Sequence, residues 1–177
     1  QPASEPVTKH DQTKTERIEL SVGNFSVQLD SPIIPVTPGA RVQATVGVRN
    51  TGFELERYRI EVSGVPREWV TVDRTEMEIP PSNQAFVTIN FKPLRRSESA
   101  PGEYPVVVTV QAKSTPDKPI QARMALIVRS FSGFGIALSS YRVEGRQPVL
   151  LYIHNQGSGP LWVVLRGHTK TGALAFG

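Results

Sequence analysis

The sequence predicts an all-β fold, an antiparallel β-sandwich, and three observations predict it. Apolar and polar residues alternate with a period of two over much of residues 18–129, as in strands with one buried and one solvated face. Turn-forming Gly, Pro and Asn residues separate the alternating segments. No apolar stripe of helical period runs for a useful length. Short strands joined by such turns are typical of sandwiches and barrels.

The alternation predicts about seven strands in residues 18–129. They are 25–29, 42–48, 58–62, 69–72, 87–91, 104–110 and 120–128. In most of them every second residue is apolar, and Val107, Ala125 and Ile127 are the departures from the pattern. This number of strands over this length is the size of one immunoglobulin-like sandwich. We therefore predict an immunoglobulin-like antiparallel β-sandwich over residues 18–130.

Four residues are expected to have structural roles in this sandwich. Asn50 and Gly52 follow a predicted buried strand and suit a turn that needs a left-handed backbone. Tyr104 begins a strand, so its ring can enter the core while its hydroxyl bonds to the preceding corner. Trp69 is expected to cover one open end of the core.

The segments on either side of this sandwich differ in character. Residues 1–17 are mostly polar, with Ala3 and Val7 as apolar exceptions, so we predict a flexible linker or tail. Residues 131–177 contain new apolar segments at 134–138, 149–153 and 161–165, which we predict to be strands.

An internal repeat is predicted from two similar turns. In both places three alternating apolar residues lead into Asn-x-Gly, and the asparagines, Asn50 and Asn155, lie 105 residues apart. We interpret residues 131–177 as a partial second immunoglobulin-like repeat of a longer tandem array, because half a sandwich leaves an apolar face without a partner. The alternative is that these strands pack onto the first unit and complete it.

Residues 46–72 also carry a resemblance to a known family. They read V-G-V-R-N-T-G at 46–52, Y-R-I-E-V-S-G-V-P at 58–66, and then Trp69. With a Pro-rich turn at 80–83 and P-G-E-Y at 101–104, this pattern resembles bacterial and archaeal immunoglobulin-like repeats associated with alpha-galactosidases and carbohydrate-binding modules, and related cell-adhesion repeats. The resemblance covers roughly residues 25–128, and Val65 stands where Leu is usual. It implies a non-catalytic spacer, stalk or docking domain beside enzymes and surface proteins.

The charge pattern argues against a nucleic-acid binder. The chain has 20 Lys and Arg against 16 Asp and Glu, and the two signs are interleaved rather than gathered into a basic stripe. The densest basic cluster is Lys92, Arg95 and Arg96, which we interpret as an exposed loop, with an anion contact as the alternative. No apolar run approaches the ~20 residues of a transmembrane helix.

The candidates for chemistry are few. The chain has no cysteine, which excludes disulfides and thiolate ligands, and its three histidines, His10, His154 and His168, form no metal-binding spacing. We expect His154 to point to solvent, since it lies opposite to the apolar residues of its strand.

Two carboxylate pairs could serve in catalysis and one group of residues could bind calcium, and the alternative for each is that they are ordinary surface residues. Glycoside hydrolases use paired carboxylates, and the pairs here are Glu54 with Glu56 and Glu76 with Glu78. Members of each pair are two residues apart and share one wet strand face, so we interpret them as surface residues. A calcium site from Asp73 and Glu76 lacks the usual loop pattern. We predict no catalytic, cofactor-binding or metal-binding residues and no cofactor, and leave ligand-binding residues unassigned.

The sequence therefore predicts a non-catalytic structural or adhesive module of a larger multidomain protein, extracellular or on the cell surface. Its expected partners are neighbouring domains of the same polypeptide, without nucleic acid. The alternative is an accessory module of a hydrolase-type protein that binds carbohydrate or protein. Sugar sites place exposed aromatic rings over pyranose rings, and the candidates here are Phe53, Phe86, Tyr141, Tyr152 and Trp162.

Overall fold

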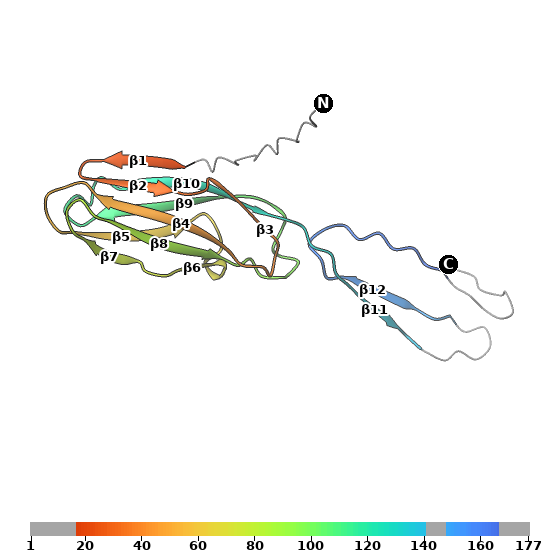
Figure 1. Cartoon of the computed structure of the whole chain (residues 1–177). Helices are drawn as coiled ribbons and strands as arrows, with labels where there is room; N and C mark the ends of the chain where they lie inside the picture. Colours follow the sequence, from red (N-terminus) through yellow and green to blue (C-terminus); the bar gives the residue numbers. More distant parts are fainter. Residues whose placement is uncertain (1–16, 141–147, 167–177) are drawn as a thin grey trace, which may run out of the picture.

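A computed structural model describes residues 17–140 and 148–166 of the chain. Two five-stranded sheets stack on each other, and a separate two-stranded hairpin follows them at one end (Figure 1). The predicted linker at 1–17 lies, apart from Arg17, outside the described residues.

The first sheet has the strand order β1-β2-β4-β8-β6. Its strands are β1 (Ile18–Val22), β2 (Phe25–Leu29), β4 (Val42–Asn50), β8 (Gln84–Phe91) and β6 (Val70–Val72). The second sheet has the order β3-β10-β9-β5-β7. Its strands are β3 (Ile33–Val36), β10 (Ile120–Val128), β9 (Gly102–Ala112), β5 (Glu56–Ser63) and β7 (Glu76–Ile79). A single 3-10 turn, η1 (Arg67–Trp69), leads into β6, and the hairpin consists of β11 (Phe134–Leu138) and β12 (Leu151–Asn155).

This topology is that of an immunoglobulin-like sandwich. The neighbours β2-β4-β8-β6 in one sheet and β10-β9-β5 in the other have the order of the two sheets of an immunoglobulin constant domain. The predicted all-β sandwich is therefore confirmed. One detail differs from the prediction, because β3 pairs with β10 in parallel and all other paired strands among the described residues are antiparallel.

The core lies between the two sheets and consists of the apolar residues that the alternation indicates. The largest fully buried side chains are Tyr58, Phe91, Leu29, Ile60, Ile79, Ile89, Leu126, Val27, Val46, Val48, Val87 and Val106. Each such aliphatic side chain contributes roughly 1.5–3 kcal/mol by leaving water. The rings of Phe25 on β2 and Tyr58 on β5 lie 5.2 Å apart between centroids, and so join the two sheets at one end of the core.

The corner formed by Trp69 and Tyr104 has the expected structure. Trp69 is 4% exposed, and its ring meets the Tyr104 ring edge-on with 5.2 Å between centroids. The Tyr104 hydroxyl donates a hydrogen bond of 2.9 Å to the carbonyl oxygen of Ala100. This contact ties the start of β9 to the turn before it, as predicted for a tyrosine at this corner.

The strand predictions fail in two ways. The short strands β1, β3 and β7 were not predicted, because each has few residues and lies at the edge of a sheet. The expected strand at 161–165 is wrong, since the structure assigns no regular secondary structure there. A strand needs a neighbour for its backbone hydrogen bonds, and within the described residues β12 pairs with β11 alone.

Candidate functional site

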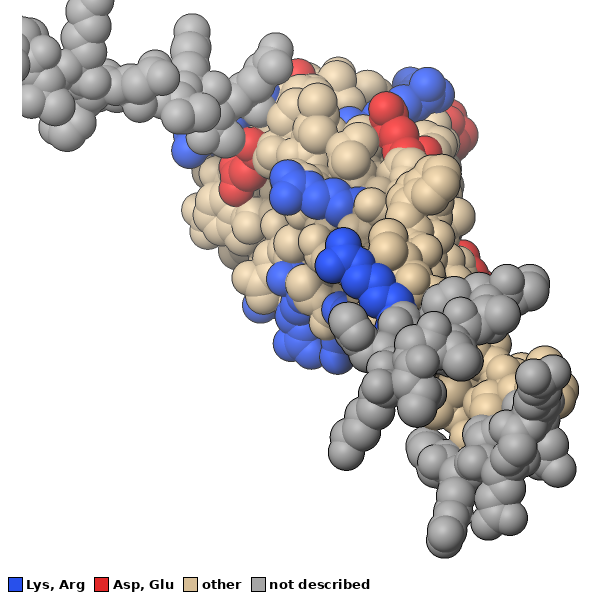
Figure 2. Space-filling model, turned by 90° about the vertical axis from the view of Figure 1, so that its right-hand side faces the viewer, with Lys and Arg blue, Asp and Glu red and all other residues tan. Residues whose placement is uncertain are grey.

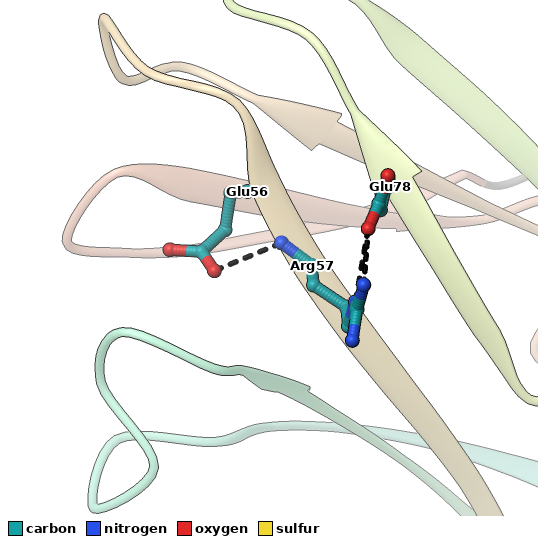
Figure 3. Close-up of polar contacts among 3 residues, drawn as sticks. All are labelled: Glu56, Arg57 and Glu78. Atoms are coloured by element: carbon teal, nitrogen blue, oxygen red, sulfur yellow. Dashed lines mark hydrogen bonds and ion pairs between the residues drawn. The ribbon is translucent and has the colours of Figure 1, made fainter.

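Glu56 is held by the turn that follows β9. One of its carboxylate oxygens accepts a hydrogen bond of 2.9 Å from the backbone N–H of Arg57 (Figure 3). The other accepts a hydrogen bond from the Ser114 hydroxyl. Partial burial raises the pKa of Glu56, but these hydrogen bonds outweigh it, and the pKa of the carboxyl lies below its ordinary value. A general acid in glycoside hydrolysis needs a raised pKa, so Glu56 has the opposite property.

The second carboxylate pair is engaged by a cation on the neighbouring strand. Glu78 on β7 forms an ion pair with the guanidinium of Arg57 on β5, and this contact raises the pKa of Arg57 (Figure 3). Figure 3 shows Glu56 and Glu78 directed to different groups of Arg57, one to its backbone nitrogen and one to its side chain. Both members of the ion pair are about half exposed, so the pair joins two strands at the surface.

Of the two calcium candidates, Asp73 is bound to protein groups and Glu76 is exposed. Asp73 accepts a hydrogen bond of 3.0 Å from the backbone N–H of Thr88, and its second oxygen lies 3.8 Å from the guanidinium of Arg74. Glu76 is exposed on β7, three residues further along the chain. In residues 17–140 and 148–166 no three acidic or histidine side chains gather as a metal site would need. His154 is exposed on β12 as expected, while His10 and His168 lie outside the described residues.

The basic loop contacts the segment that leads into the hairpin. The guanidinium carbon of Arg95 lies 4.8 Å from the centroid of the Phe131 ring, and its nitrogen donates to the carbonyl oxygen of Ser132 at 3.4 Å. Figure 2 shows Lys and Arg side chains spread over this end of the sandwich with neutral surface between them, rather than as one stripe. Arg95 therefore has an internal partner, a role that sequence reasoning missed because Phe131 lies 36 residues away.

The exposed aromatic candidates in residues 17–140 and 148–166 lie on separate elements. Phe86 is 54% exposed on β8 of the first sheet, and Tyr152 is 58% exposed on β12 of the separate hairpin. Phe53 and Trp162 are more than nine-tenths exposed, in the loop before β5 and in the segment after β12. Tyr141 lies outside the described residues. The predicted wet-face positions of Phe86 and Tyr152 are confirmed, but they belong to different sheets.

A hollow lies between two loops at the end of the sandwich opposite the hairpin. Its volume is about 630 Å³, and it lies between the loop before β5 and the turn after β9. Its lining includes Phe53 and the 60% exposed Leu55, the lysines Lys113 and Lys118, and the carboxylates Glu54 and Glu56. Sequence reasoning identified Phe53 and the two carboxylates but not the lysines, which lie some 60 residues further along the chain.

None of the helices in the described part of the chain is long and apolar enough to cross a membrane. No family model matches the sequence, and no curated protein is similar to it in sequence.

Solved structures are similar to the sandwich in fold alone. A family 123 glycoside hydrolase from Clostridium perfringens matches with a TM-score of 0.52 and 9% sequence identity, over 60% of this chain and 27% of its own. A FixG-related protein from Vibrio parahaemolyticus matches with a TM-score of 0.47 and 13% identity, over 61% and 99% of the two chains. The PapD-like domain 7 of human CEP192 matches with a TM-score of 0.39 and 15% identity, over 58% and 83%. The chain thus spans about a quarter of the length of the glycoside hydrolase.

Proposed function

We propose that this chain is a non-catalytic, immunoglobulin-like structural or adhesive module of a larger multidomain protein, outside the cell or on its surface, with neighbouring domains of the same polypeptide as its partners. One observation carries the proposal. In each of the two candidate carboxylate pairs one member is bound to a protein group, Glu56 to the Ser114 hydroxyl and Glu78 to the Arg57 guanidinium. Their contacts connect strands and turns of the sandwich, which is a structural role.

The resemblance of residues 46–72 to repeats found beside carbohydrate-active enzymes supports the same role. Such repeats separate or dock other domains, and an immunoglobulin-like sandwich with most of its ionisable groups solvated suits that use.

The test is an assay of the purified chain against a panel of chromogenic glycosides. We expect no turnover above the buffer background at any pH between 4 and 9. Turnover that disappears in Glu56→Gln or Glu78→Gln would overturn the proposal, because it would place chemistry on these carboxylates. Arg59→Gln, which changes an exposed charge on the same strand, is the matched control.

A second candidate function is ligand binding, and the hollow next to Phe53 favours it. An exposed aromatic residue at the rim of a concave surface, with both lysines and carboxylates beside it, suits a sugar or a peptide. A glycan array of the unmodified chain and of Phe53→Ser tests this function. Binding that is lost in Phe53→Ser supports it, and the absence of any bound glycan removes its carbohydrate form.

A further inference from the structure

The hairpin presents an apolar face with no cover among the described residues. Phe134, Ile136 and Leu138 of β11 share this face with Leu151 and Ile153 of β12, because strand residues two apart point the same way. Phe134 is 55% exposed and Ile136 58% exposed. Apolar side chains gathered on one face in this way mark an interaction surface.

The strand register of the hairpin equals that of β2 and β4 in the first sandwich. Phe134 pairs with Asn155 as Phe25 pairs with Asn50. The next two same-face pairs also correspond, Ile136–Ile153 to Val27–Val48 and Leu138–Leu151 to Leu29–Val46. In the first sandwich all of these side chains are at most 2% exposed.

The turns after the two asparagines carry the same hydrogen bonds. The Asn50 Oδ1 atom accepts from the N–H of Gly52 at 2.9 Å, and the Asn155 Oδ1 atom accepts from the N–H of Gly157 at 2.9 Å. Each Nδ2 donates to the carbonyl oxygen four residues later, at 2.7 Å for Asn50 and 2.9 Å for Asn155.

The residue after each asparagine extends the correspondence. The N–H of Thr51 donates to the carbonyl oxygen of Asn24, the residue before β2, at 2.9 Å. The N–H of Gln156 donates to the carbonyl oxygen of Gly133, the residue before β11, also at 2.9 Å. The two asparagine turns thus share three equivalent hydrogen bonds, two made by the asparagine side chain and one by the backbone N–H of the next residue.

Asn50 and Phe25 each make a contact to the opposite sheet that has no described equivalent in the hairpin. The Asn50 Nδ2 atom also donates to the carbonyl oxygen of Ile79 on β7, at 2.9 Å. The Phe25 ring packs against Tyr58 on β5. Asn50 is 1% exposed as a result, whereas Asn155 is exposed.

We infer that the apolar face of β11–β12 is half of a second sandwich core, and that its occupant is a further β-sheet of the same polypeptide. That sheet corresponds to β3-β10-β9-β5-β7 of the first unit. It offers a strand carbonyl to the second N–H of the Asn155 amide and a large ring or aliphatic side chain to Phe134. The inference rests on the proposed function as a module of a multidomain protein.

The test compares the 177-residue chain with the same chain extended by the next 60 to 70 residues of its gene, about the number needed to complete a sandwich of ~100 residues. The measurement is amide hydrogen exchange at Gly135 and Tyr152, because their N–H groups face the partner strand of the hairpin, whereas those of Ile136 and Ile153 point away from it. We expect exchange at both positions to slow by about 100-fold or more in the extended chain, because a covered strand opens with its whole domain.

Two variants of the extended chain test whether the slower hydrogen exchange is caused by formation of a second core. Ile136→Asp is expected to abolish the protection at Tyr152, while the first sandwich keeps its own. Ala137→Asp, one residue along on the other face of the strand, is the matched control and is expected to retain the protection.

Three results would overturn the inference. The first is equal exchange rates in the two chains, and the second is equal effects of the two variants. The third is protection of Gly135 in the 177-residue chain that rises with protein concentration, which would make a second copy the occupant. A gene without further strand-forming sequence would do the same. None of these results affects the glycoside assay, so failure of this inference is distinct from failure of the proposed function.

Discussion

Gly64, in the turn after β5, lies directly against the backbone of Pro105 in β9. A Cβ atom on Gly64 would stand 1.9 Å from the Pro105 carbonyl oxygen, far inside van der Waals contact. The φ angle of Gly64 is also +96°, in the region that L-residues rarely adopt. The turn therefore requires glycine for two separate reasons, and the second sheet depends on it because β5 pairs with β9 at this end.

Gly64→Ala is expected to reduce the free energy of unfolding by about 3 kcal/mol or more, because it combines a backbone clash with a strained φ angle. Gly23→Ala is the control, since Gly23 has a φ of +55° but nothing within 4 Å of the added Cβ. We expect it to cost about 1 kcal/mol. Urea unfolding followed by Trp fluorescence gives both values, and equal losses would contradict the role assigned to Pro105.

Asn50→Ala is expected to cost about 3 kcal/mol in the same experiment. The substitution removes three hydrogen bonds at a site that is 1% exposed and leaves the carbonyl oxygen of Ile79 without its amide donor. Asn155→Ala removes two matching bonds at an exposed site, so we expect it to change the unfolding of the sandwich by less than about 0.5 kcal/mol. A small effect of Asn50→Ala would mean that its bonds to the opposite sheet contribute little.

Tyr58 is expected to make stability fall in alkaline solution. Burial, with a smaller contribution from the charge of Glu56, raises the pKa of Tyr58 to about 12. In the unfolded chain the phenol loses its proton near pH 10, so between pH 10 and 12 the unfolded state holds fewer protons than the folded state. Stability from this group is complete below pH 10 and is lost as the pH rises to 12, by up to about 3 kcal/mol.

The measurement is the free energy of unfolding from pH 9 to 12 for the unmodified chain and for Tyr58→Phe. The variant is expected to lack the part of the decline that belongs to Tyr58. Difference absorbance of tyrosinate between the two proteins locates the transition, and a midpoint near pH 10 would show that the ring is accessible to water.

Phe86→Ala is expected to lower stability by about 1 kcal/mol and to leave any glycan binding unchanged. Phe86 is paired across the strands with Gly47, and a Cβ on Gly47 would stand 3.3 Å from its ring. The ring therefore covers backbone that glycine leaves open, as aromatic cross-strand partners of glycine do. Tyr152→Ala, another exposed aromatic residue, is expected to leave the sandwich unaffected. Loss of a bound glycan without loss of stability in Phe86→Ala would instead make Phe86 a ligand contact.

The sequence by itself determined which residues face the core and where the main strands turn. Period-two alternation placed Val27, Val46 and Ile89 inside, because the pleat of a strand directs alternate side chains to opposite faces. The corner at Tyr104 was predictable for a similar reason, since its hydroxyl bonds to Ala100, four residues away in the chain. Both properties are local, because the direction of a strand side chain and the bond from Tyr104 to Ala100 each depend on residues close together in the chain.

The tertiary structure alone decided which strands are neighbours and hence which polar groups meet. Arg57 forms an ion pair with Glu78, and Glu56 accepts a hydrogen bond from Ser114. The guanidinium of Arg95 lies over the ring of Phe131. All three contacts form because segments distant in the sequence lie side by side in the fold. Alternation gives the face of a residue but not its partner on the next strand. Contacts between distant segments depend on the packing of the whole core, which no local pattern records.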